Sequence, residues 1–488
     1  MEKKEKIIYG SGRFGSSLLL DLVSFLTFYL YFEIFNLAPI LSGIATGLGK
    51  FTIAFSGFFF GYISDKTNTK FGRRKPYILI GAPALAISFI LLFIPHIFGL
   101  NLIKILGISI GNEIRLFIYL LIFVCTFNFF YGFLLSPYQA WMRELTLESE
   151  RIEVSAYQNF FNVLAVGVSA IFAFSFPEAL TGEGMSILPI IVIIFGLIEI
   201  CGYVTPLIKL KEDLSVKIER NLIEGLKVTW RNKNFMTWQL AQGCFAIVFT
   251  IVINSALGFM ENVLLFGMIQ YIIAALILFI AVIILWTIWG YLSKKKSKHY
   301  ALQSALIIFT IFIPFSLVIG IVKIEILGFI YIGLIAAGIS SWYLFPYVVM
   351  ADFAEEDELI TGDLHKAGLY WGVKELYLNI FQAPAMILSG LIFGLLPYLP
   401  ITFTESNRIT WIIILGIQDL PGSNQIIVWL GLLLGKFPFS FDPIPKLVSS
   451  GYLWFGPITV IFMVLGLLVF RNVKIDFNLE ERRKEINE

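Results

Sequence analysis

Ionisable side chains interrupt several long apolar stretches of this 488-residue chain. They are Asp21, Glu33, Lys50, Glu199, Lys374 and Glu375. A charge inside a hydrocarbon layer costs several kcal/mol unless it is paired or hydrated, and charges kept there commonly bind or relay ions, protons or charged solutes. Asp21 can take up and release a proton, and Lys50 can attract an anion or pair with a carboxylate. We therefore expect a solute- or proton-handling site, provided that the surrounding stretches span a bilayer.

The composition indicates a membrane protein. Hydrophobic residues make up 58% of the chain and charged residues 14%, with a mean hydropathy of +0.84. A soluble protein this apolar could not cover its surface with polar groups. The net charge of +2 gives no sign of a nucleic-acid partner, and we expect none. The cysteines Cys125, Cys201 and Cys244 lie in apolar stretches without metal-ligand spacing, so neither a metal nor another cofactor is expected.

Apolar stretches near 20 residues, the length of a membrane-spanning helix, occur twelve times. They lie near 15–37, 41–63, 77–99, 116–138, 156–178, 187–208, 236–256, 264–290, 300–321, 326–350, 367–393 and 450–471. Most of the 36 Lys and Arg residues fall on one side of these stretches, which the positive-inside rule assigns to the cytoplasm. We expect an all-α, multi-pass protein of the cell membrane with both termini in the cytoplasm.

The charged segment 209–234 divides the twelve stretches into two sets of six. We interpret it as a cytoplasmic linker between an N-terminal half, 1–208, and a C-terminal half, 235–488. A weak internal repeat supports this division, since Gly61-Tyr-Ile-Ser and Gly290-Tyr-Leu-Ser close the second stretch of each half. Related halves of this kind rock about a central site in transporters.

Residues 398–449 break the regular plan. Their apolar runs are too short to span a bilayer and are separated by Gly, Pro and Asn. We expect an external cap of interfacial or short helices inserted in the C-terminal half, with a re-entrant hairpin as the alternative.

Three polar segments between apolar stretches carry recognisable patterns. The first, Gly61–Tyr77, reads Gly-Tyr-Ile-Ser-Asp and then Phe-Gly-Arg-Arg-Lys-Pro-Tyr. The second, 346–373, contains Ala-Asp352, the acidic run Glu355–Glu358 and Gly-Leu-Tyr370. The third contains Pro137-Tyr, Glu-Leu-Thr and Ser-Ala-Tyr157. Together these segments touch both halves of the chain.

These patterns resemble those of the glycoside–pentoside–hexuronide:cation symporters and the related sucrose transporters, within the major facilitator superfamily. The resemblance implies twelve helices in two six-helix halves and transport of a small polar solute, a sugar or a glycoside. The basic segment and the acidic segment should both face the cytoplasm, and their opposite charges on the two halves suit a gate that closes when the outside opens. The gating residues would be Gly61, Asp65, Gly72, Arg73, Arg74, Asp352, Glu355 and Glu356. The alternative is two solvated loops that never meet.

The family's helix-two cation site does not transfer to this chain. Melibiose-type members hold Na⁺ with two carboxylates one turn apart in the second helix, and aligning on Gly61 places these at Ile53 and Gly57. Neither residue offers a side-chain oxygen, and Lys50 lies on the same helical face. We therefore expect no Na⁺ coupling through this site.

Other family positions also change. The carboxylate of helix four falls at Leu135, the Arg of helix five near Gln158 and the Lys of helix eleven near Asn379. The sugar-binding carboxylate of helix one falls at Ser17, but Asp21 lies four residues on, on the same helical face. The scaffold therefore matches the family, whereas its coupling chemistry differs.

The resemblance places stretches one, two and eleven beside the central cavity, which favours Asp21, Lys50 and Lys374 as functional and leaves Glu33 and Glu199 as structural. Aromatic and amide side chains that could stack on or bond to a sugar complete the candidate set, although each could instead be interfacial or packing. These are Tyr138, Gln139, Gln158, Trp371, Tyr377 and Asn379.

The expected function is secondary active transport of this solute by a monomer in the lipid bilayer, with a proton as the candidate coupling ion at Asp21. We expect Asp21 to form a charge pair with Lys50 in the cavity, with Lys374 as the rival partner. The alternatives are a facilitative uniporter or exchanger of a non-sugar solute, and a membrane-embedded transferase. A transferase that binds Mg²⁺ and a diphosphate needs two Asp-rich motifs, and this chain has one acidic run. We therefore expect no enzyme and no catalytic residues.

Overall fold

The computed structural model describes residues 2–97, 111–146, 150–179, 184–210, 229–322, 324–361, 367–396, 398–400 and 447–475. In this part of the chain, 12 helices are long and apolar enough to cross a membrane, which confirms the predicted all-α plan. Apolar runs become helices in lipid because each backbone polar group must then bond within its own segment. Exposed side chains such as Leu79, Ile208 and Ile269 form the outward apolar surface that lipid would cover.

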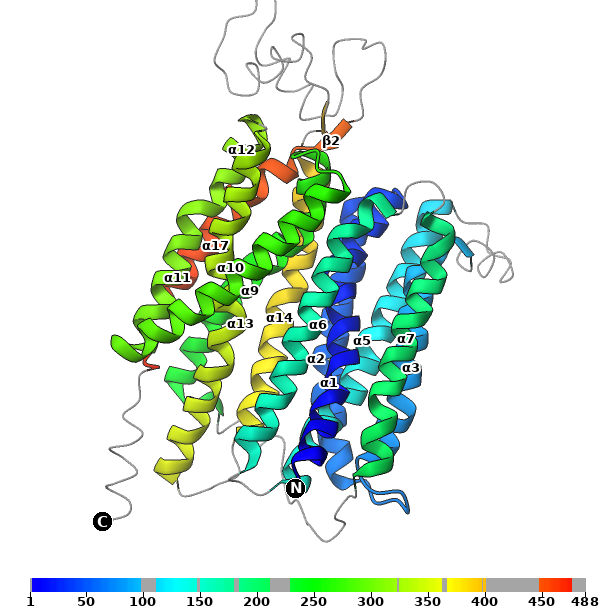
Figure 1. Ribbon diagram of the computed structural model, residues 1–488, viewed down its shortest axis with the longest axis vertical. Coiled ribbons are helices and arrows are strands. Elements are labelled where there is room, and N and C mark those ends of the chain that lie inside the picture. The colour runs from blue at the N-terminus through cyan, green and yellow to red at the C-terminus, as the bar shows by residue number, and fades with distance from the viewer. Residues whose placement is uncertain are drawn as a thin grey trace, which may run out of the picture.

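The first six spanning helices form one half of the bundle (Figure 1). They are α1 (Lys3–Tyr29) with its π-helical continuation η1 (Leu30–Ile34), α2 (Pro39–Lys66), α3 (Lys75–Phe93), α5 (Asn112–Leu145), α6 (Arg151–Ala179) and α7 (Gly184–Lys209). α1 packs against α6 and α7, while α5 packs against α2 and α3.

The other six spans form the second half. They are α9 (Lys233–Asn262), α10 (Met268–Lys295), α11 (Lys298–Phe312) continued by the 3₁₀ turn η3 (Ile313–Phe315) and α12 (Ser316–Val322), α13 (Glu325–Thr361), α14 (Ala367–Leu395) and α17 (Gly451–Phe470). The third span of this half changes to 3₁₀ geometry around Pro314, which has no backbone N–H to continue an α-helix.

Two short strands lie between α14 and α17. β1 (Tyr398–Pro400) pairs antiparallel with β2 (Leu447–Ser449), so the two ends of the predicted external insertion are adjacent. Strands were not predicted there. The cap expected between them, 401–446, and most of the predicted linker, 211–228, lie outside the described residues.

The helices extend beyond the apolar stretches at one end of the bundle. We call this end, where α1 begins and α2 ends at Lys66, the basic end, and the opposite end the far end. α2 continues past Gly61 through Asp65, and α13 runs on through Asp352, Glu355 and Glu356. Asp65 and these three acidic residues, which were predicted to lie in loops, therefore lie on helices. Hydropathy locates only the part of a helix that lies in hydrocarbon, whereas Lys and Glu are good helix formers in water.

A tight turn joins α2 to α3. Gly72 has a φ of 112°, a conformation that favours glycine, and the Thr69 hydroxyl donates to its carbonyl oxygen at 2.6 Å. Gly61 is less constrained, because a Cβ there would lie 3.6 Å from Ser136 Cβ, an ordinary contact. The close approach of α2 to α5 lies instead at Gly132, where a Cβ would come within 2.5 Å of the backbone nitrogen of Gly57.

The halves meet along α2 and α14, α1 and α9, and α6 and α10. The α2–α14 contact at the far end is a contact between backbones. A Cβ on Gly43 would lie 2.6 Å from the carbonyl oxygen of Met386, and one on Gly390 would lie 2.5 Å from that of Pro39. Small residues allow such close approach of membrane helices.

Two hydrogen bonds also join the halves at the far end. The Tyr29 hydroxyl on α1 donates to Glu261 on α9, and the Tyr452 hydroxyl on α17 donates to Glu33 at 2.6 Å. The rings of Phe32 and Phe393 lie beside them, 6.0 Å apart between centroids. The far end of this structure is therefore closed, and Glu33 takes part in the closure.

Candidate functional site

A small polar pocket lies between helices of both halves. Its polar lining consists of Ser24 and Thr27 from α1, Thr46 and Lys50 from α2, Asn128 from α5 and Asn254 from α9. Its volume of about 20 Å³ holds roughly one water molecule. A larger solute therefore requires the surrounding helices to separate, as expected of a site that opens and closes.

Two polar atoms at this pocket lack protein partners. Asn254 Nδ2 donates to Ser389 Oγ at 3.1 Å, but Asn254 Oδ1 and Thr27 Oγ1 are buried with no hydrogen-bond partner among the described residues. Leaving such groups unpaired is costly, so native proteins normally satisfy them with protein, water or ligand. A hydroxyl-bearing solute or water would supply the missing partners.

Asp21 and Lys50 lie on neighbouring helices and attract each other electrostatically. In the described structure no ion pair joins them, and Asp21 Oδ2 is buried without a hydrogen-bond partner. Asp21 is also attracted by Arg13, and Lys50 by Glu375 on α14. The direct Asp21–Lys50 pair stays a prediction.

Arg13 is a residue that sequence reasoning did not identify. It precedes Asp21 on α1 by about two helical turns. Its positive charge attracts the carboxylates of both Asp21 and Glu199 on α7. Glu199 is fully buried and packs directly over Gly15, where a Cβ would lie 2.7 Å from Glu199 Cα. Arg13 was missed because the predicted first span began at residue 15, two residues later.

Tyr138 lies away from the polar pocket, inside the N-terminal half. Its ring stacks on Tyr9 with centroids 4.7 Å apart, and its hydroxyl donates to the Tyr9 carbonyl oxygen. Tyr203 packs edge-on to it at 4.9 Å. In this state the ring is fully buried among other aromatics, so its predicted stacking on a sugar requires a rearrangement. Gln139 beside it is half-buried.

The remaining predicted residues occupy two helices. Gln158 on α6 is buried, and its Nε2 has no hydrogen-bond partner among the described residues. On α14, Lys374 forms an ion pair with Glu375 at 3.2 Å, and Asn379 Nδ2 donates to the Glu375 carbonyl oxygen at 2.8 Å. Tyr377 is half-buried, and the side chain of Trp371 lies outside the described residues.

Two charged groups that were predicted to form the gate make bonds within their own half. Arg74 is fully buried and donates to Ser64 Oγ at 2.5 Å, and Asp352 pairs with Lys298 at 2.5 Å. Arg73 is also buried. Glu355 and Glu356 are half-buried, and the side chain of Asp65 lies outside the described residues. A gate across the halves stays a prediction.

Comparison with known sequences identifies the family. A family model described as MFS/sugar transport protein matches residues 8–422. The uncharacterized symporter sll1374 of Synechocystis sp. is 28% identical over 160 residues, covering 32% of this chain and 28% of that protein. The uncharacterized symporter YnaJ of Bacillus subtilis is 36% identical over 89 residues, 18% of this chain and 19% of that protein. Each match thus spans less than a third of the relative's length.

Solved structures agree on the fold. A bacterial homologue of the human lysosomal transporter Spinster, inward-facing and unoccupied, superposes with a TM-score of 0.61 at 13% identity over 100% of this chain and 99% of that one. The xylose transporter XylE from E. coli gives 0.56 at 12% identity over 98% of each chain. The nucleoside transporter NupG gives 0.53 at 11% identity over 96% of this chain and 99% of that one.

At such identities the structural likeness establishes the fold alone. The family model covers most of the chain, and the helices have the two-half arrangement that the sequence resemblance predicted. This chain belongs to the MFS/sugar transport protein family of the major facilitator superfamily.

Proposed function

We propose that this chain is a secondary active transporter that moves a small polar solute, a sugar or a glycoside, across the cell membrane by alternating access. The observation that supports it most is the polar pocket between the halves, with the unpartnered Asn254 Oδ1 and Thr27 Oγ1 at its wall. The positive-inside rule places the basic end in the cytoplasm. The closed far end then faces outside, and the opposite state requires its contacts to break.

The same proposal includes a proton as coupling ion, Asp21 as its carrier, and a monomer divided into 1–208, a linker 209–234 and 235–488. Asp21 suits the role because it can change its charge while lying among helices of the bundle core. The membrane-embedded transferase is disfavoured, since family and fold both point to transport.

A counterflow assay tests directly whether the protein is a carrier. A solute library is first screened for compounds that raise the thermal stability of the purified protein, because a ligand of the native state stabilises it. Proteoliposomes loaded with the best compound should then transiently accumulate the labelled compound from outside. An open pore would equilibrate the label without an overshoot, and such behaviour would exclude the carrier.

Facilitative exchange of a non-sugar solute is the second candidate, and Lys50 favours it. An ammonium group in the pocket suits an anionic solute such as a carboxylate, and the family's cation-holding positions are Ile53 and Gly57. The two candidates differ in accumulation. A symporter concentrates its solute when a proton gradient is imposed, whereas a uniporter or exchanger does not.

We expect transport to be independent of Na⁺. Ile53 is buried and apolar, Gly57 has no side chain, and no cluster of potential metal-binding side chains occurs in the described ranges. Initial uptake with an inward Na⁺ gradient should agree within about two-fold with uptake when K⁺ replaces Na⁺, with the membrane potential clamped. A clear stimulation by Na⁺ would show that the alignment on Gly61 misplaces the site.

Arg73→Ala should impair transport without abolishing solute binding. Arg73 is buried in the turn between α2 and α3 and does not line the polar pocket, so it can bias conformational exchange without touching solute. We expect uptake to fall about tenfold, while ligand-induced thermal stabilisation persists. Lys70→Ala is the matched control, because Lys70 carries the same charge in the same turn but is exposed. Normal uptake by Arg73→Ala would remove the basic segment from the gating mechanism.

A further inference from the structure

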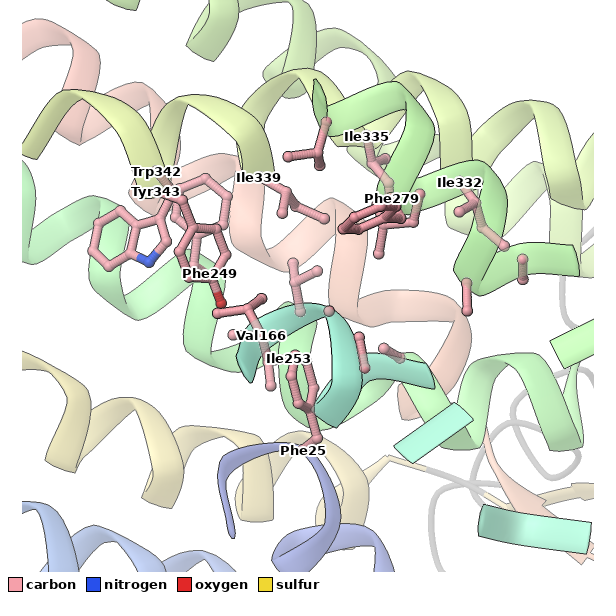
Figure 2. A pocket seen from close by; sticks show the side chains of 18 of the residues that line it. Phe25, Val166, Phe249, Ile253, Phe279, Ile332, Ile335, Ile339, Trp342 and Tyr343 are labelled. Carbon is pink, nitrogen blue, oxygen red and sulfur yellow. The ribbon is translucent and has the colours of Figure 1, made fainter. Parts of the chain in front are cut away.

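A second and much larger cavity lies between the halves. Its volume is about 390 Å³, and its walls come from α6 of the N-terminal half and α9, α10 and α13 of the C-terminal half, with Phe25 of α1 and Phe455 of α17. Figure 2 shows Phe249, Phe279, Ile335 and Ile339 turned toward the same space. This volume lies within the usual range for pockets that bind small-molecule ligands.

The cavity wall is hydrocarbon and aromatic carbon. Asn159 also lines it and is exposed, whereas two other polar side chains of the wall already have partners. Asn162 Oδ1 accepts a hydrogen bond from Ser17 at 2.6 Å, and Trp286 Nε1 donates to the Ser340 carbonyl oxygen at 2.8 Å. A sugar ring placed there would lose the hydrogen bonds that its hydroxyls make with water and gain few in return. The wall instead suits an apolar group.

The size of the cavity sets the size of that group. An engineered apolar cavity of about 150 Å³ binds benzene, and this one is more than twice as large. A two-ring aromatic group or a medium-length alkyl chain would fill it. Phe279 and Trp342 contribute aromatic rings to the wall against which an aromatic ring can pack.

The polar pocket and the apolar cavity lie on opposite sides of α1 and α9. Ser24 lines the polar pocket and Phe25 the apolar cavity on α1, while Asn254 and Ile253 do the same on α9. α1 and α9 belong to different halves and pack against each other. The partition between the two spaces is therefore a boundary between halves, which opens when the halves separate.

We propose that the apolar cavity holds the apolar part of an amphipathic solute whose polar part binds at the polar pocket. This inference rests on the proposed transport function and narrows its substrate class to aryl or alkyl glycosides over free sugars. Because the cavity has walls from both halves, its occupant is coupled to their relative movement. A lipid acyl chain shares the same chemistry and is distinguished by the experiment.

The test compares matched glycosides on the full-length protein in lipid nanodiscs. For a panel of hexoses and pentoses, the 2-naphthyl glycoside should bind about tenfold more tightly than the methyl glycoside of the same sugar. Ala170→Phe fills the cavity from α6 and should abolish this ratio while leaving the affinity for the methyl glycoside unchanged. Leu164→Phe is the control, because Leu164 is exposed on the same helix and does not line the cavity.

A probe without a sugar distinguishes failure of the proposed sugar specificity from failure of the apolar site. If no glycoside binds, saturable binding of radiolabelled 2-naphthol that is lost in Ala170→Phe but kept in Leu164→Phe still supports the apolar site. Equal affinities for methyl and naphthyl glycosides, or absence of saturable naphthol binding, would overturn it. A phospholipid found by native mass spectrometry, dependent on Ala170 and not displaced by the naphthyl compounds, would also overturn it by showing that lipid fills the cavity.

Discussion

Asp21→Asn should abolish the accumulation of solute that an inward proton gradient drives, reducing it about tenfold or more to the equilibrium level. The physical reason is that Asp21 then can no longer exchange a proton, while Arg13 and Lys50 lose the negative charge that attracts both. Arg13 and Lys50 then keep the attraction of Glu199 and Glu375 alone among the acidic groups named here, which shifts the relative free energies of the states of the transport cycle. The measurement is uptake in proteoliposomes as external pH rises from 6 to 8, with the internal pH fixed.

The sign of the pH dependence follows from the charge change. Lower external pH protonates Asp21 on the outward-open side and promotes loading, so wild-type accumulation should fall as external pH rises. The asparagine variant should show no such slope. His96 does not confuse this result, because partial burial lowers its pKa below the usual 6.5, which leaves the imidazole mostly neutral over most of that range.

A double-mutant cycle identifies the partner of Asp21. If Lys50 is the partner, Lys50→Gln alone should also lose accumulation, and Asp21→Asn with Lys50→Gln should recover facilitated exchange, since neither charge is then left alone. If Arg13 is the partner, recovery should occur with Arg13→Gln instead. Lys374 was the rival in sequence, but it pairs with Glu375 in the structure. Unchanged pH-driven accumulation in Asp21→Asn would refute Asp21 as the coupling group.

Simple hydrogen bonding of Asp21 to nearby hydroxyls is the competing explanation. Ser17 shares its helical face, yet the Ser17 hydroxyl donates to Asn162 Oδ1 at 2.6 Å. Ser17→Ala therefore serves as the control, and we expect it to keep a wild-type pH slope.

Gly390→Ala should prevent closure of the far end and reduce transport about tenfold or more. A Cβ on Gly390 would lie 2.5 Å from the Pro39 carbonyl oxygen and 3.1 Å from Ile40 Cα. Both are backbone atoms, which cannot turn aside as a flexible side chain can. The added methyl group must therefore push α14 from α2 and weaken the state in which the far end is closed.

Accessibility of the polar pocket measures this shift. Ser24→Cys, in a background with Cys125, Cys201 and Cys244 changed to Ser, places a thiol at the pocket wall. A membrane-impermeant maleimide added from the far side should label it about tenfold faster in Gly390→Ala than in its parent.

Gly333→Ala is the matched control. Gly333 is also a glycine inside a spanning helix, but a Cβ there would meet Ile277 Cγ2 at 3.8 Å, an ordinary contact. Alanine favours helix over glycine at both positions by about 1 kcal/mol, so a difference between the two variants reports the α2–α14 contact alone. Equal labelling and transport in the two variants would mean that this contact does not hold the far end closed.

The sequence alone was sufficient for the number of spans and the family. A long apolar run in lipid forms a helix, because a helix makes all its backbone hydrogen bonds within its own segment. The position of Ile53 and Gly57 follows from counting along α2 from Gly61. These are local properties, so they do not depend on how the helices pack.

The ends of the helices were less predictable. α13 continues through Glu355 and Glu356 to Thr361, and α1 begins at Lys3 rather than near residue 15. Hydropathy falls where a helix leaves the hydrocarbon, although its backbone hydrogen bonds continue in water. Because the predicted first span began after Arg13, this residue was not identified from the sequence, although its charge attracts Asp21 in the structure.

Packing alone decided which polar residues meet. Asn128 and Asn254 are ordinary amides in apolar helices, and only the tertiary structure brings them to one pocket with Lys50. The same packing encloses Tyr138 among Tyr9 and Tyr203, away from that pocket. Helical periodicity says which residues share a face, but the partner that a face meets depends on contacts between residues more than a hundred positions apart, such as Gly43 and Gly390.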